Sequence, residues 1–394
     1  MTQNEPWHAP SGLGQPPASA PYGSPSLEAG PAAGIRAGWA PPPRPGLIPL
    51  RPLDVGRILA APYQLLRRNP RPTFGMSLLL QGSVLLLTLV VVSIAAFFSL
   101  SRIDFATGSE VSDEIVAGSI GMILLSSLVP LALSLVATAI MQGIIVLEVA
   151  RQSLGEKLRF RELWALARGR VLALVGYSLA LTAVLLVAVA VVIGLVAGLS
   201  FLGSAGVVTG VALALLLGAA LVALGAWIGT KLAFVPSILM LERLTVREAM
   251  GRSWRLSTGA FWKILGILLL VAFILNVVSS IAGAPLQFVS VLLPALIAPT
   301  GDETAIIALV VAVTVVSLVL TIVVSAVILV VQSATTALLY LDQRIRKEGL
   351  DLELARYVEA RQSGGAAGMA DPYAARMAAP PATPAAQPDA SPWA

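Results

Sequence analysis

The sequence predicts an all-α membrane protein with six transmembrane helices, and three observations predict it. Hydrophobic residues make up 57% of the chain and charged residues only 12%, whereas soluble domains contain about a quarter charged residues. The charges are also segregated, because six long stretches lack them almost completely. Finally, a pattern that begins with a glycine and ends with an acidic residue occurs three times, which is typical of folds built from repeated units.

Each apolar stretch is long enough to cross a bilayer, which takes about 20 residues. Five contain no Asp, Glu, Lys or Arg, and the fourth contains only Lys231. Pro285 should end the fifth span early, so we expect residues 285–299, which also contain Pro294, to form a short helix or a re-entrant segment on the outer side. The expected spans are residues 73–100, 115–147, 171–202, 207–241, 264–284 and 304–341.

The repeat predicts three helical hairpins. In each copy a glycine opens the outgoing span and an acidic residue ends the returning span, roughly 66 to 76 residues later. We expect the glycines to be closely packed and the acids to form a cytoplasmic acidic ring. Arginines such as Arg68, Arg170 and Arg255 would pair with this ring, and a cation-selective mouth is the alternative. The glycine and acid pairs are Gly75 with Glu148, Gly176 with Glu242, and Gly266 with Asp342.

A short basic segment precedes each outgoing span, near residues 54–68, 159–170 and 246–255. Apolar residues recur at helical spacing in these segments, and arginines surround them. We therefore expect each hairpin to be preceded by an amphipathic helix in the cytoplasmic interface, where Arg and Lys meet anionic lipid headgroups. A fourth such segment, residues 349–362, follows the last span.

The distribution of charge predicts that both termini are cytoplasmic. Lys and Arg lie before the first span, after the last, and in alternate loops between, so the positive-inside rule gives the orientation in a cell membrane. The net charge of +5 then reflects this topology and not nucleic-acid binding. Residues 1–50 and 363–394 are rich in Pro, Gly and Ala, and we expect disordered cytoplasmic tails on either side of a membrane domain at 51–362. The tails serve as spacers or bind a cytoplasmic protein partner.

The residues offer no catalytic chemistry. The chain has no cysteine, and its one histidine, His8, lies in the N-terminal tail, so a nucleophile with a histidine base and a zinc site are both excluded. No phosphate-binding glycine loop is present. We expect no enzyme activity, cofactor or metal.

Four polar residues within the spans form a candidate intramembrane polar site: Lys231, Gln142, Asn276 and Gln332. An ionisable residue inside a membrane usually marks a functional site, which makes Lys231 a candidate. Its long side chain could instead carry the ammonium to the lipid headgroups. The amides could equally form interhelical hydrogen bonds.

Small residues form a second pattern in the third span, where Gly194 and Gly198 make a GxxxG pair. We expect this pair to pack helices together within the chain, with homodimerisation as the alternative.

Three segments carry a resemblance to a known family: RPLDVGRILAAPYQLLRRNPRPTFG (51–75), RSWRLSTGAFWKILGILLL (252–270) and LLYLDQRIRKEGLDLELA (338–355). They resemble the glycerophosphoryl diester phosphodiesterase membrane domain family of bacterial integral membrane proteins, over about residues 50–358. The resemblance implies a membrane domain only. The catalytic barrel found with some members uses histidines and acidic metal ligands, and no position here matches them.

Two functions follow from these observations. The first is a non-catalytic membrane protein that associates with lipid, or that acts as a scaffold or anchor for a partner. The alternative is a transporter or channel for a small or lipid-like solute that uses the polar groups around Lys231. A wet cavity lined by Lys231, Gln332 and Asn276 would favour the alternative.

Overall fold

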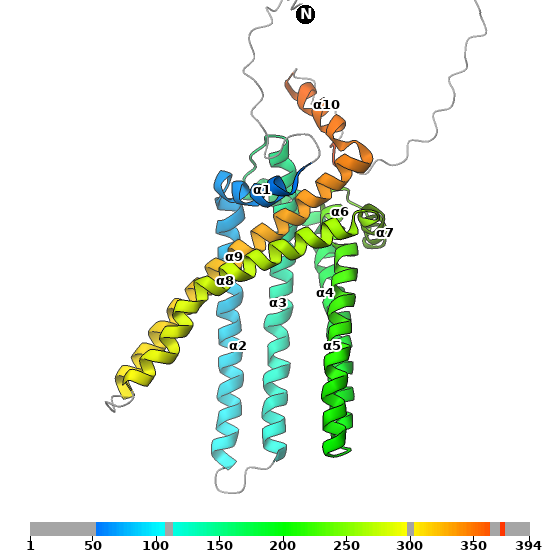
Figure 1. The fold of residues 1–394 in the computed structure, drawn as a ribbon. Coiled ribbons are helices and arrows are strands. Elements are labelled where there is room, and N and C mark those ends of the chain that lie inside the picture. Colours follow the sequence, from blue (N-terminus) through cyan, green and yellow to red (C-terminus); the bar gives the residue numbers. More distant parts are fainter. Residues whose placement is uncertain (1–52, 107–112, 298–302, 363–370, 375–394) are drawn as a thin grey trace, which may run out of the picture. The chain divides into compact units, whose positions relative to one another are not determined.

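The computed structural model describes residues 53–106, 113–297, 303–362 and 371–374. The chain divides into residues 1–43 and residues 44–394, and everything described belongs to the second unit. The expected N-terminal tail and most of the expected C-terminal tail therefore lie outside the described residues. Throughout the described part of the chain, the regular secondary structure is helical (Figure 1).

Six helical stretches in the described residues are long and apolar enough to cross a membrane, which agrees with the number expected. They are formed by α2, α3, α4, α5 together with α6, α8 and α9. The elements are α1 (Val55–Arg68), the π-helical turn η1 (Arg71–Gly75), α2 (Met76–Ala106), α3 (Asp113–Ser153), α4 (Phe160–Ser200), α5 (Ser204–Leu232), α6 (Val235–Leu241), α7 (Val246–Ser257), α8 (Phe261–Ile297), α9 (Glu303–Glu348) and α10 (Leu350–Gln362).

The expectation of a break at Pro285 is wrong. Helix α8 continues through both Pro285 and Pro294 to Ile297, so the structure contains no re-entrant segment between them. A proline removes one backbone hydrogen bond, but a helix in a membrane tolerates this loss because the alternative exposes more unsatisfied backbone.

A proline does interrupt the fourth span. Pro236 has no N–H to donate to the carbonyl of Leu232 four residues earlier, and α5 ends at Leu232. Ser253 of α7 bridges the gap, because its hydroxyl donates to the carbonyl oxygen of Lys231 at 2.7 Å and accepts the N–H of Phe234 at 3.3 Å. The chain then continues as α6.

The expected segments before the spans differ among themselves. Helices α1 and α7 are separate helices, and a turn with Gly259 at a φ of 82° divides α7 from α8. The segment at 159–170, in contrast, is the first part of α4, which is continuous from Phe160 to Ser200. No proline or turn separates that segment from its span, so the helix simply continues.

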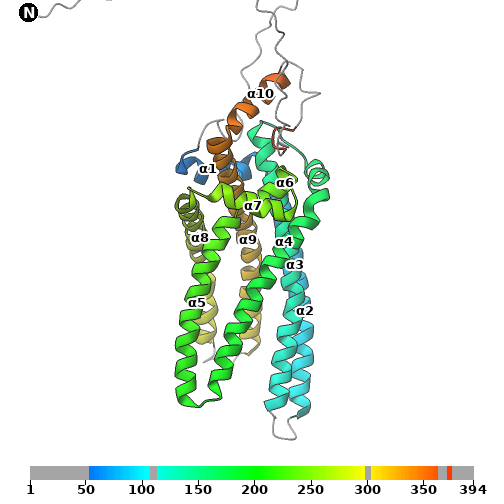
Figure 2. The same cartoon turned by 90° about the vertical axis from the view of Figure 1, so that its right-hand side faces the viewer.

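Most of the core lies at one end of the long helices, where α1, α6, α7 and α10 also lie (Figures 1 and 2). We call this the charged end, because it contains Glu148, Glu242 and Asp342. Helix α3 is central to it and packs against α2, α4, α6 and α9. Beyond the charged end, α2 packs with α3, α4 with α5, and α8 with α9. We call the parts of these helices remote from the charged end the far halves.

The glycines do not pack as expected. A Cβ atom added at Gly176 or Gly266 would meet nothing within 4 Å, and the same holds for Gly194 and Gly198. Close packing of these glycines within the chain is therefore wrong. A close approach occurs instead at Gly143 in α3, where an added Cβ would lie 2.6 Å from the terminal methyl of Met240 in α6.

Candidate functional site

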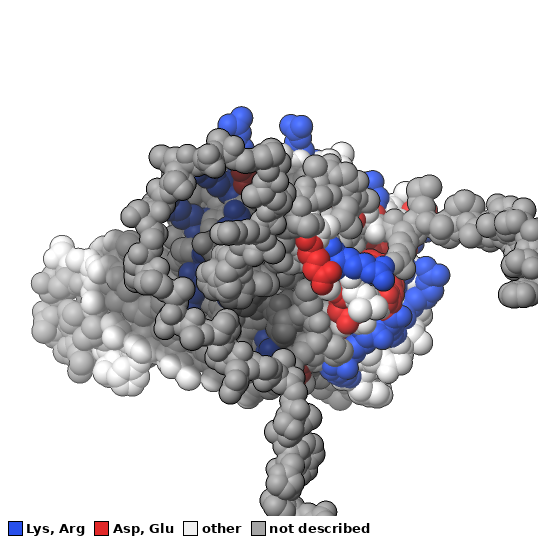
Figure 3. Space-filling model, turned by 90° about the horizontal axis from the view of Figure 1, so that it is seen from above, with Lys and Arg blue, Asp and Glu red and all other residues white. Residues whose placement is uncertain are grey.

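The charged end is the part of the molecule in which charged side chains gather. Figure 3 looks onto this end and shows Lys and Arg side chains at several places around it, with acidic side chains gathered to one side. The three acids expected as a ring are all buried here, with residue exposures of 0% for Glu148, 4% for Glu242 and 0% for Asp342. Each has a different set of partners.

Glu242 forms an ion-pair network between α6, α7 and α9. Its carboxylate pairs with Arg252 of α7 and accepts the hydroxyl of Tyr340 at 2.7 Å. Arg344 donates to the Tyr340 hydroxyl at 3.1 Å and, with Arg252, pairs with Glu348 at 2.9 Å. Burial disfavours the charged form of Arg252, but the hydrogen bond and charge of Glu242, together with the charge of Glu348 and the nearby Tyr340, outweigh burial, so the pKa of Arg252 is raised. The network borders a cavity of about 470 Å³.

Asp342 ties Leu53, which lies just before α1, to the last long helix. It accepts the backbone N–H of Leu53 and the ammonium of Lys263, each at 2.9 Å. Arg346 pairs with the same carboxylate at 2.9 Å and donates to the carbonyl oxygen of Leu53 at 2.8 Å. Both backbone polar groups of Leu53 are therefore satisfied by α9.

Glu148 has amide partners instead of charged ones. Asn69, between α1 and η1, donates to its carboxylate at 2.7 Å, and Gln152 donates at 2.6 Å. These two amides are its hydrogen-bond partners in the described part of the chain. The Asn69 amide also donates to the carbonyl oxygen of Leu158 at 3.1 Å, which links the end of α3 to the start of α4.

Two of the arginines expected as partners of the acids, Arg170 and Arg255, do not pair with them. Arg252 and Arg344, and not Arg255, pair with Glu242. The guanidinium of Arg170 donates to the carbonyl oxygen of Leu244 at 3.5 Å. Sequence reasoning also missed Tyr340 and Asn69, because nothing in the spacing indicates which distant side chain faces each acid.

A short C-terminal segment also packs on the charged end. The Tyr373 hydroxyl donates to the carbonyl oxygen of Ala150 at 2.9 Å and lies 2.5 Å from the Ser153 hydroxyl. Asp371 pairs with Arg151 at 2.6 Å. Residues 371–374 are therefore an ordered part of a stretch that we expected to be a disordered tail throughout. Burial raises the pKa of Tyr373 above its ordinary value.

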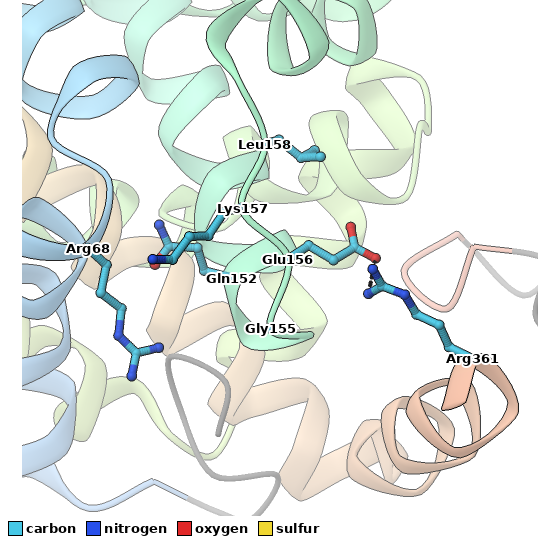
Figure 4. Close-up of a pocket in the computed structure, with 7 residues that line it drawn as sticks. All are labelled: Arg68, Gln152, Gly155, Glu156, Lys157, Leu158 and Arg361. Atoms are coloured by element: carbon cyan, nitrogen blue, oxygen red, sulfur yellow. Dashed lines mark hydrogen bonds and ion pairs between the residues drawn. The ribbon is translucent and has the colours of Figure 1, made fainter. Parts of the chain in front are cut away.

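A cavity of about 640 Å³ opens at the charged end between the end of α1, the α3–α4 loop and α10 (Figure 4). Three basic residues and one acidic residue line it: Arg68, Lys157, Arg361 and Glu156. Arg361 pairs with Glu156 at 2.8 Å, whereas Lys157 is exposed and extends toward Gln152. We call this the basic cavity.

The structure separates the four members of the candidate intramembrane site. Lys231 lies in the last turn of α5, with its ammonium 5.3 Å from the ring centre of Trp254 and 5.6 Å from that of Phe261. Both distances fit cation–π contacts. Asn276 is exposed on α8. Gln142 and Gln332, in contrast, line one cavity of about 400 Å³ between α3, α4, α5, α6, α8 and α9. The structure thus brings together two of the four residues.

The chemistry of this end is that of ion pairs and hydrogen bonds between helices. Among the residues that the structure describes, no group of three His, Asp or Glu side chains is placed to hold a metal ion.

Comparisons with protein-family models, with curated proteins and with solved structures find no match to this chain.

Proposed function

We propose that this chain is a non-catalytic, multi-pass membrane protein that associates with membrane lipid, with anionic headgroups held at the charged end. The observation that carries the proposal is the basic cavity, which holds three basic residues against one acidic residue beside long apolar helices. A basic residue near an anionic membrane surface contributes about 1 kcal/mol of attraction.

The same proposal includes the orientation and the repeat. The charged end would be cytoplasmic, with both termini on that side of the cell membrane. Contacts that join the start of a span to the end of its hairpin support the repeat: Asn69 with Glu148 and Lys263 with Asp342 are both 79 residues apart. Arg170 with Leu244 is the counterpart in the second hairpin.

Membership of the glycerophosphoryl diester phosphodiesterase membrane domain family belongs to this proposal and rests on the three segments quoted above. Scaffolding or anchoring of a cytoplasmic partner by the tails, and homodimerisation, are compatible with it. A transporter that uses the polar groups around Lys231 has less support, because neither Lys231 nor Asn276 lines the cavity that holds Gln142 and Gln332.

Mass spectrometry of the lipids retained on the purified full chain tests lipid association. We expect anionic lipid to be enriched over the bulk membrane. Lys157→Gln with Arg361→Gln should reduce the enrichment roughly fivefold for each residue, since about 1 kcal/mol is lost each time. The matched control is Arg356→Gln, an exposed arginine of α10 outside the cavity. Retained lipid with the bulk composition in the unaltered chain would contradict the proposal.

Cysteine labelling tests the orientation, because the chain has no cysteine of its own. We expect a membrane-impermeant maleimide to label Phe201→Cys, in the α4–α5 turn, from outside intact cells. Lys157→Cys should be labelled only after the membrane is opened. The reverse pattern would contradict a cytoplasmic charged end.

A further inference from the structure

The cavity between the helices holds more polar groups than its place among long apolar helices predicts. It has a volume of about 400 Å³, within the range of small-molecule sites. We call it the polar cavity. The polar side chains that line it are Thr138 and Gln142 of α3, Tyr177, Ser178 and Thr182 of α4, and Gln332, Ser333 and Thr336 of α9.

Most of these side chains have no hydrogen-bond partner in the described part of the chain. Thr336 donates to the carbonyl oxygen of Gln332 at 2.9 Å, as serines and threonines in helices often do. The side chains of Gln142, Gln332 and Tyr177 form no such bond with the rest of the described chain. The interhelical hydrogen bonds expected of the two glutamines are therefore not formed. Gln332 is exposed and Gln142 and Tyr177 are partly exposed, so a partner from outside the chain can reach all three. Inside a membrane, a polar group without a partner costs free energy.

The depth of the polar cavity shows which partner reaches it. Gln142 precedes Glu148 by six residues, and Gln332 precedes Asp342 by ten. At about 1.5 Å per residue, the cavity lies roughly 9 to 15 Å along the helices from the charged end. With the charged end at the membrane surface, as proposed above, this position falls in the nearer half of a hydrocarbon core about 30 Å thick.

The side chains that line the polar cavity favour an uncharged ligand over a charged one. None of the side chains that line the polar cavity belongs to Asp, Glu, Lys or Arg. An anionic phosphate placed there would lose its hydration with no cation to compensate, which is costly at membrane depth. Amide and hydroxyl groups instead match the hydroxyl and ester groups of an uncharged lipid. The cavity is also open at its edge, where Leu181 is 41% exposed.

We propose that the polar cavity binds the head of an uncharged, hydroxyl-bearing lipid such as a diacylglycerol, while the acyl chains lie against the exposed apolar far halves of the helices. Gln142, Gln332 and Tyr177 supply the hydrogen bonds to the hydroxyl and ester oxygens. The inference rests on the proposed lipid association but adds a second class of lipid, bound at a different depth from the anionic headgroups of the basic cavity.

The test uses the full chain in phosphatidylcholine nanodiscs that contain a small fraction of photoactivatable diacylglycerol. We expect cross-links on α3, α4 and α9, mapped by peptide mass spectrometry. Gln142→Leu with Gln332→Leu should reduce cross-linking about tenfold, since two hydrogen bonds of ordinary strength are lost. The matched control is Asn276→Leu, an exposed amide on α8 outside the cavity, which should leave cross-linking unchanged.

Competition on the unaltered chain gives a second measurement that does not depend on how the variants fold. Excess unlabelled diacylglycerol should abolish the cross-links, and triacylglycerol, which has no free hydroxyl, should not. Equal competition by both lipids, or an equal loss in Asn276→Leu, would overturn the inference. If diacylglycerol does not cross-link but anionic lipid is still retained, the inference fails and the proposed function stands. If neither lipid is retained, both fail.

Discussion

The charged end and the far halves of the same helices follow different rules. At the charged end, α3, α6 and α9 are buried over long stretches, and charged side chains pair inside the protein. In the most apolar stretch of each candidate span, by contrast, at most 22% of the residues are buried. Leu215 of α5 and Ile281 of α8, which are 72% and 69% exposed, are typical of the far halves.

The difference shows which part of the molecule fixes the arrangement of the helices. Apolar side chains in the far halves gain little by packing on one another, since lipid tails are equally apolar. At the charged end, a buried charge left without its partner is costly, so arrangements of the helices that break these pairs are disfavoured. The charged end therefore determines how the helices associate, and the far halves mainly match the membrane.

The largest effect is expected from Glu242→Leu. The change removes the buried carboxylate that Arg252 and Arg344 share, and leaves them only Glu348, whose side chain is 30% exposed. Loss of one member of a buried pair costs about 3–5 kcal/mol, to be measured as a fall in thermal stability in detergent. The control is Glu359→Gln on the exposed face of α10, which should have almost no effect. A small effect at Glu242 would mean that the network does not hold the helices together.

The next prediction compares leucines in the two regions. Leu338→Ala at the charged end, where the side chain is fully buried, should reduce the free energy of unfolding by about 2–5 kcal/mol. Leu86→Ala in α2, where the side chain is 65% exposed, should change it by about 0.5 kcal/mol or less. Equal losses would show that the far halves are packed against protein after all.

The third prediction compares glycines. Gly143→Ala should destabilise the fold by about 1 kcal/mol, at the low end for overpacking, because the flexible end of Met240 must move and Leu174 lies 3.3 Å from the new methyl group. Gly194→Ala meets open space and should stabilise α4 by about 0.5–1 kcal/mol, since alanine favours a helix. Thermal unfolding of both variants measures the two signs. Destabilisation by Gly194→Ala would instead indicate a helix packed there, as in a homodimer.

The smallest effect concerns pH at the start of α7. The hydroxyl and N–H of Thr245 donate to Glu248 and lower the pKa of this exposed carboxyl below its ordinary value of 4.5. A lowered pKa in the folded state means that the stabilisation is present above pH 4.5 and is lost as the pH falls through the folded value. Glu248→Gln should therefore remove a small part of the acid-induced loss of stability, measured by circular dichroism. An unchanged pH profile would contradict the role of this cap.

The comparison also explains which residues could be predicted. Glu148, Glu242 and Asp342 can be picked out from the sequence, because a charge at the end of an apolar run is conspicuous. Their partners cannot, because Asn69 and Lys263 are each 79 residues away from the acids that they contact. The break at Pro236 and the continuity through Pro285 show the same limit. A proline removes one hydrogen bond in either place, and only at the first does a side chain, Ser253, satisfy the opened backbone.

The sequence by itself determined the six long apolar helices, because a stretch of about 20 residues without charge is most stable as a helix across a membrane. It also determined that charges stand at the ends of these helices, because a charge is costly in the stretch that crosses a membrane. Only the tertiary structure decided which of those charges pair, that Gln142 and Gln332 share one cavity and that Lys231 lies apart from it. These contacts depend on the rotation and height of each helix relative to its neighbours, which a pattern along one helix does not contain.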